Sequence, residues 1–88
     1  MDEIEGWRNR IDEIDTQLLE LLNERAKCAS AIGKIKIARG LKIFSPEREK
    51  AVLEHIKEQN KGPLDNSAVE RIFERIIEES RRIEIIAV

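Results

Sequence analysis

The residues best suited to chemistry are charged side chains that fall on the apolar faces of expected helices. On the first helix the apolar stripe passes through Leu21, Cys28 and Ile32, and Arg25 and Lys36 occupy positions on the same stripe. Eleven residues separate the two cations, and eleven steps of about 100° return the second to within roughly 20° of the first. Arg25 and Lys36 therefore point the same way.

Polar groups also occupy inner positions elsewhere along the chain. One cation flanks the same stripe near the N-terminus, two charged residues precede Val52 on the second helix, and two polar residues continue the stripe of Phe73 and Ile76 on the third. The full set has four cations, two carboxyls and one hydroxyl: Arg8, Arg25, Lys36, Arg48, Glu49, Ser80 and Glu84.

Each of these charges could instead lie at the edge of its stripe and extend its head group into water. As a set they are harder to explain in that way, because burying them unpaired would be costly. Cations outnumber carboxyls in the set, although the whole chain carries a net charge of -2. Since the planar fork of arginine suits carboxylates, we predict a pocket for a small dianion.

Other kinds of site have weaker support. His55 has no Cys or His neighbour at metal-ligand spacing, so we interpret it as a surface residue. Cys28 and Trp7 are interpreted as packing residues. The sequence has no glycine-rich phosphate loop, no Ser-His-Asp set and no metal signature. Any chemistry must therefore use positioning and electrostatics.

The elements that position these residues are helices. Apolar residues recur at three- and four-residue steps from Ile4 to about Ala38, which predicts one long amphipathic helix. Asp2 and Glu5 have the form of a capping box at its start, and Gly40 is expected to end it.

Two shorter helices follow. Ser45-Pro46 predicts a second helix with Ser45 as its N-cap, which runs to about Gln59 before Asn60-Lys61-Gly62-Pro63. The third helix could begin at Asp65 or at Ser67. Few aromatics and a 41% apolar fraction also favour an all-α chain, with one domain over residues 1–88.

The length of the first helix predicts a partner. A helix of about 35 residues is roughly 52 Å long, whereas a compact domain of this size has a radius of gyration near about 12 Å. Two shorter helices cannot cover it. We therefore predict an obligate homodimer in which a second copy runs alongside.

Composition excludes several partners. With 16 basic and 18 acidic side chains there is no overall field to attract nucleic acid or an anionic membrane. No apolar run approaches the roughly 20 residues of a membrane span, and one cysteine is consistent with a reducing compartment. We expect a soluble, cytoplasmic protein.

Six segments together resemble the all-helical chorismate mutases in order and spacing over nearly the whole chain: Arg8–Asp15, Leu21–Arg25, Ile32–Lys36, Pro46–Glu49, Asn60–Leu64 and Ile72–Ser80. The resemblance implies an intertwined dimer of three-helix chains that converts chorismate, a compact dicarboxylate, to prephenate. It also implies a step in the biosynthesis of phenylalanine and tyrosine, and a reaction that uses no cofactor or metal.

The resemblance also implies roles in substrate binding. Arg25 and Arg48 are similar to carboxylate ligands, and Arg8 to an arginine that reaches into the partner's site. Glu49 is similar to the acceptor for the substrate hydroxyl, and Ser80 to a further carboxylate contact.

For catalysis, Lys36 resembles the lysine that contacts a carboxylate and the ether oxygen of the breaking bond. Glu84 resembles the second donor to that oxygen, but it stands where some bacterial members have glutamine. Because a carboxyl donates a hydrogen bond only when protonated, we predict activity that falls as pH rises. Ser45 stands where some members have aspartate, which leaves its contact with ligand open.

Two alternatives stay open at this point. An isochorismate-pyruvate lyase shares this fold and anion site, and a non-catalytic helical dimerisation module would share only the fold. Mutases of this type also occur fused to prephenate dehydratase, and the sequence does not decide whether this one does.

Overall fold

The chain folds into three α-helices, which confirms the all-helical prediction. In a computed structural model that describes residues 2–86, the helices are α1 (Glu3–Ala38), α2 (Pro46–Gln59) and α3 (Asn66–Ile86). Residues 2–86 contain no strand. Three residues of the predicted 1–88 domain, Met1, Ala87 and Val88, lie outside the described part.

Local hydrogen bonds explain the ends of α1. The Asp2 side chain accepts a hydrogen bond from the Ile4 backbone N–H at 3.0 Å and so caps the helix. At the other end Gly40 adopts φ +66°, its N–H donates to Ile37 O, and the Leu41 N–H donates to Lys36 O at 2.7 Å. This is the paired pattern of a glycine C-cap, and it confirms Gly40 as the terminator.

The starts of α2 and α3 differ in how they are capped. α2 begins at Pro46 with Ser45 at the N-cap position, as predicted, but the Ser45 hydroxyl makes no capping hydrogen bond. For α3, Asp65 Oδ1 accepts from the Ala68 N–H at 2.7 Å. Of the two predicted starts, the structure therefore has the one capped by Asp65.

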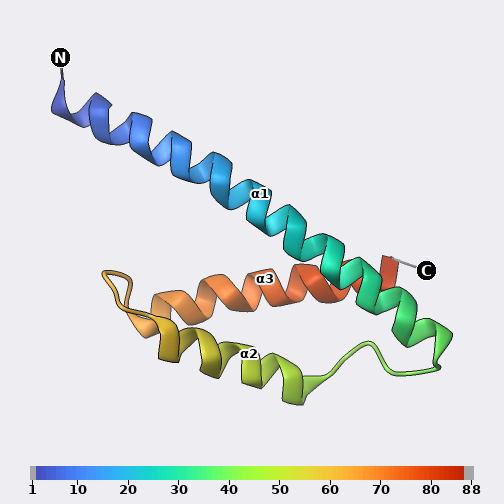
Figure 1. The fold of residues 1–88 in the computed structure, drawn as a ribbon. Helices are drawn as coiled ribbons and strands as arrows, with labels where there is room; N and C mark the ends of the chain where they lie inside the picture. The colour runs from blue at the N-terminus through green and yellow to red at the C-terminus, as the bar shows by residue number, and fades with distance from the viewer. Residues whose placement is uncertain (1, 87–88) are drawn as a thin grey trace.

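α3 is the central element of the chain. α1 and α2 each pack against α3, and Figure 1 shows α3 crossing the C-terminal half of α1 with α2 on its other side. The buried residues at these contacts are few and small or branched: Ala29, Gly33, Val69 and Ile77.

Gly33 allows α1 and α3 to approach closely. A Cβ built at Gly33 would lie 2.6 Å from Glu84 O and 2.7 Å from Glu84 Cα, and both of these are backbone atoms. Gly33 is therefore a position where the backbones of α1 and α3 come into close contact.

Within residues 2–86, neither α2 nor α3 covers the N-terminal half of α1. It extends away from the other two helices (Figure 1), and the molecule measures 58 × 24 × 15 Å with a radius of gyration of 16.3 Å, against about 12 Å for a compact domain of this length. Its large apolar side chains are exposed, among them Ile4, Trp7, Ile11, Ile14 and Leu18. Trp7 is 72% exposed and so does not pack in a core formed by residues 2–86. None of the described helices is long and apolar enough to cross a membrane.

Candidate functional site

A cleft of about 380 Å³ lies between the three helices, beside the segment that joins α1 to α2. This volume is within the range of small-molecule sites, roughly 300 to 1,000 Å³. Its apolar lining includes Ala29, Ile32, Val52 and Ile77, so polar groups converge over an apolar floor. The charged and hydroxyl-bearing lining residues are Arg25, Lys36, Ser45, Arg48, Glu49, Ser80, Arg81 and Glu84.

Six of the seven predicted site residues line this one cleft; Arg8 does not. Arg8 lies seventeen residues before Arg25 on the same helix, about 26 Å along the axis. Its exposed side chain donates to Glu5 at 2.8 Å. Arg8 therefore cannot reach the cleft of its own chain.

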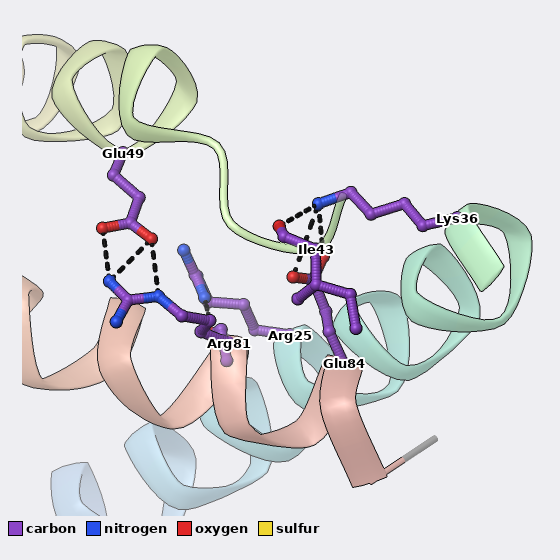
Figure 2. A network of polar contacts seen from close by, with 7 residues as sticks. Arg25, Lys36, Ile43, Glu49, Arg81 and Glu84 are labelled. Carbon is purple, nitrogen blue, oxygen red and sulfur yellow. Dashed lines mark hydrogen bonds and ion pairs between the residues drawn. The ribbon is translucent and has the colours of Figure 1, made fainter. Parts of the chain in front are cut away.

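Lys36 and Glu84 form the pair at the end of the cleft nearest the α1–α2 segment. Lys36 Nζ donates to the backbone oxygen of Ile43 at 2.7 Å and to the Glu84 carboxylate at 3.2 and 3.4 Å (Figure 2). The Lys36 and Glu84 side chains are only 19% and 12% exposed. Since an ammonium group has three donors, these two partners leave one for a ligand.

Arg25 is held by the neighbouring helix. It donates to the Ser80 hydroxyl, and that hydroxyl donates to Ile76 O at 2.9 Å. Arg25 and Ser80 are both half-buried. By contrast, Arg48 projects from the first turn of α2 and is exposed. Ser45, just before that turn, also lines the cleft.

The sequence reasoning missed Arg81. Its Nε donates to Glu49 Oε2 at 2.9 Å, and its NH2 group donates to Glu49 Oε1 at 2.6 Å and to Oε2 at 2.8 Å. The hydrogen bond to Glu49 raises the pKa of Arg81 above its ordinary value. The guanidinium also lies 4.7 Å from the centre of the Phe44 ring. Arg81 follows Ile77 by four residues and precedes Glu84 by three, so helical spacing could have found it.

Cys28 also differs from its prediction. It is exposed rather than packed in a core, and it lies on the wall of the cleft. The residues of α1 that are buried in its contact with α3 are instead Ala29, which follows Cys28 in the sequence, and Gly33, one turn further along the same face.

The charges of the cleft favour an anion. Its lining carries four cations and two carboxylates, a formal charge of +2, although the chain as a whole carries -2. Both carboxylates are already paired, Glu84 with Lys36 and Glu49 with Arg81. The positive charges of Arg25 and Arg48 therefore remain for a ligand, and two arginines match a ligand with two carboxylates.

Comparisons with known proteins identify the family of the chain. A family model described as chorismate mutase type II matches residues 7–85. A chorismate mutase of Methanocaldococcus jannaschii is 36% identical over 81 residues, which cover 88% of this chain and 79% of that protein.

A bifunctional chorismate mutase/prephenate dehydratase of Stutzerimonas stutzeri is 43% identical over 81 residues, which cover 86% of this chain and 22% of that protein. The chain thus spans about a fifth of the length of such bifunctional relatives. A crystal structure of chorismate mutase from Helicobacter pylori in complex with prephenate superimposes with a TM-score of 0.87 at 26% identity, and covers 96% of this chain and 91% of that one. By sequence and by fold, the chain belongs to the type II chorismate mutase family.

Proposed function

We propose that this chain is a chorismate mutase, which rearranges chorismate to prephenate in the biosynthesis of phenylalanine and tyrosine. The observation that carries the proposal is the cleft, where two arginine charges remain after both carboxylates are paired. Family membership supports it, and so does the likeness to a structure described as a complex with prephenate.

Substrate binding in this proposal fixes the shape of a flexible dicarboxylate. Arg25 and Arg48 hold the two carboxylates, and Ser80 adds a contact beside Arg25. Glu49 accepts a hydrogen bond from the substrate hydroxyl. The rearrangement breaks one bond and forms another within a single molecule, so holding the reacting ends in contact supplies much of the acceleration.

The second contribution is electrostatic. Negative charge grows on the ether oxygen as its bond to the ring breaks, and Lys36 donates to that oxygen with the proton that its two protein partners leave free. Ile43 O and Glu84 fix the ammonium group in advance. Glu84 is the second donor to the ether oxygen when it is protonated.

The proposed assembly is a homodimer that contributes Arg8 to each site in trans. Support comes from the exposed apolar stripe on the N-terminal half of α1 and from the distance of about 26 Å between Arg8 and its own cleft. A second chain that packs along the stripe would bury these side chains and bring its Arg8 toward the cleft. We place this dimer in the cytoplasm.

The direct test is to mix the protein with chorismate, follow the loss of chorismate absorbance, and identify the product. The measurement is then repeated in the presence of a bicyclic dicarboxylate that mimics the transition state. We expect prephenate to form, the inhibitor to stop the reaction, and Arg25→Leu to bind the inhibitor poorly. Pyruvate release from isochorismate as the main reaction would indicate the lyase instead. A chain that turns over neither compound and does not bind the inhibitor would be a dimerisation module.

A further inference from the structure

We propose that Arg81 is a positioning residue that acts through Glu49: it orients the Glu49 carboxylate toward the ligand hydroxyl and cancels its charge in a site for a dianion. This inference rests on the proposed function and adds a residue that the sequence reasoning did not assign. The Arg81 guanidinium donates hydrogen bonds to both oxygens of the Glu49 carboxylate, and Figure 2 shows this pair bridging α3 and α2.

The contact is built as a rigid one. Three hydrogen bonds of 2.6 to 2.9 Å join the edge of the Arg81 guanidinium to both oxygens of Glu49. The two side chains are 34% and 25% exposed, so water screens the pair only in part. Paired donors in a planar fork fix the plane of a carboxylate as well as its position.

Arg81 also connects three segments of the chain that line the cleft. It stands on α3, its partner Glu49 stands on the first turn of α2, and its guanidinium stacks on Phe44 in the segment between α1 and α2. Arg48 precedes Glu49 on that same first turn. The contact between Arg81 and Glu49 therefore also holds the first turn of α2, which carries Arg48, a proposed carboxylate ligand.

Without Arg81, Glu49 would be a poor partner for this substrate. A free glutamate side chain loses substantial rotamer freedom when a ligand fixes it, and its negative charge would oppose a dianion. Removal of Arg81 would lower the formal charge of the cleft lining from +2 to +1. With Arg81 in place, its three hydrogen bonds use three of the roughly four acceptor positions of the Glu49 carboxylate, and the remaining one can accept from a hydroxyl.

The test compares Arg81→Met with Arg82→Met in the whole chain. Arg82 is the neighbour on α3, its side chain is 72% exposed, and it does not line the cleft. For each variant we would measure kcat and KM for chorismate, the thermal unfolding midpoint, and the affinities of two bicyclic dicarboxylates that differ only in the hydroxyl. Loss of a cation weakens both inhibitors alike, so the ratio of the two affinities reports the orientation of Glu49.

For Arg81→Met we expect the preference for the hydroxyl-bearing inhibitor to fall by about 10- to 100-fold, the range for a hydrogen bond to a charged group. KM should rise more than kcat falls, because this contact exists before and during the reaction. Arg82→Met should behave like the parent chain. Arg81→Lys keeps the charge without the fork, so it should give an intermediate preference, and it replaces Arg81→Met in the comparison if the methionine variant does not fold.

A double-mutant cycle decides whether Arg81 acts through Glu49. In a Glu49→Gln background the further change Arg81→Met should leave the inhibitor preference unchanged. The inference is overturned if Arg81→Met keeps the parent's preference, if Arg81→Lys restores it fully, or if Glu49→Gln does not alter it. Failure of the proposed function would look different, because the parent chain itself would then bind neither inhibitor.

Discussion

Replacement of Gly33 by alanine separates what helix propensity predicts from what packing predicts. Gly33 lies inside α1, and in an exposed helix interior alanine is more favourable than glycine by about 1 kcal/mol. Propensity alone therefore predicts a more stable protein. The structure predicts the opposite, because the new Cβ would lie 2.6 Å from Glu84 O.

The size of the effect follows from that distance. To bring this contact from 2.6 Å to an ordinary 3.4 Å, the two helices must separate by about 0.8 Å there. The obstructing atoms belong to the backbone of α3, so no side chain can rotate away. Overpacking of this kind typically costs about 1 to 3 kcal/mol, and after the gain in propensity of about 1 kcal/mol we expect Gly33→Ala to lose up to about 2 kcal/mol of stability.

The same shift would reach the cleft. Glu84 is the residue pushed away, and its carboxylate is 3.2 Å from Lys36 Nζ. A further 0.8 Å would take the pair beyond hydrogen-bond length. Under the proposed function a displacement near 1 Å at the reacting centre costs on the order of 10²-fold in rate, so kcat should fall while the fold remains helical.

The assay is urea unfolding followed by circular dichroism at one fixed protein concentration, with chorismate turnover measured on the same samples. Gly6→Ala is the matched control, since Gly6 is also in α1 and a Cβ there has nothing within 4 Å. Gly6→Ala should be neutral or more stable, with unchanged turnover. A Gly33→Ala protein more stable than its parent, with normal turnover, would refute the close approach of α1 and α3.

Three further predictions concern the proposed site. Lys36→Ala should lower kcat by about 10² to 10³, the cost of losing one preorganised donor, with an unchanged helical spectrum, and near-normal turnover would remove Lys36 from its role. Glu84→Gln should keep kcat at or above the parent's value, because a glutamine amide always carries an N–H donor for the ether oxygen whereas a carboxyl donates only when protonated; a large fall in kcat would count against Glu84 as the second donor. Arg8→Ala and Arg25→Ala should each be inactive alone, but mixed dimers should regain activity, because one of their two sites has both arginines intact. No recovery in mixtures shown to exchange subunits would contradict the contribution of Arg8 in trans.

Much of the fold could be read from the sequence because its signals are local. A repeat of apolar residues every three or four positions defines α1 through contacts within one or two turns, and Gly40 ends it by a conformation that glycine adopts easily. The start of α3 was ambiguous because Asp65 and Ser67 are both suitable caps. The choice depended on which side chain reached a free backbone N–H.

The site was predictable to the extent that helical spacing placed its residues. Arg25 and Lys36 are three turns apart on one helix, so their shared direction follows from geometry alone. A cation on an apolar stripe was a sufficient signal for both. Helical spacing from Ile77 and Glu84 would have placed Arg81 near the site, but its role depends on Glu49, 32 residues earlier in the chain, and no local pattern predicts that contact.

By itself, then, the sequence determined three helices, the end of α1 at Gly40, the start of α2 at Pro46 and an excess of cations on inner faces, and it predicts a partner along α1. Only the tertiary structure decided that α3 is the central element, that the α1 and α3 backbones approach closely at Gly33, and that each cleft carboxylate has its own cation. The reason is physical: helix formation depends on residues within a few positions of one another, whereas the pairing of Arg81 with Glu49 or Lys36 with Glu84 depends on how whole helices pack.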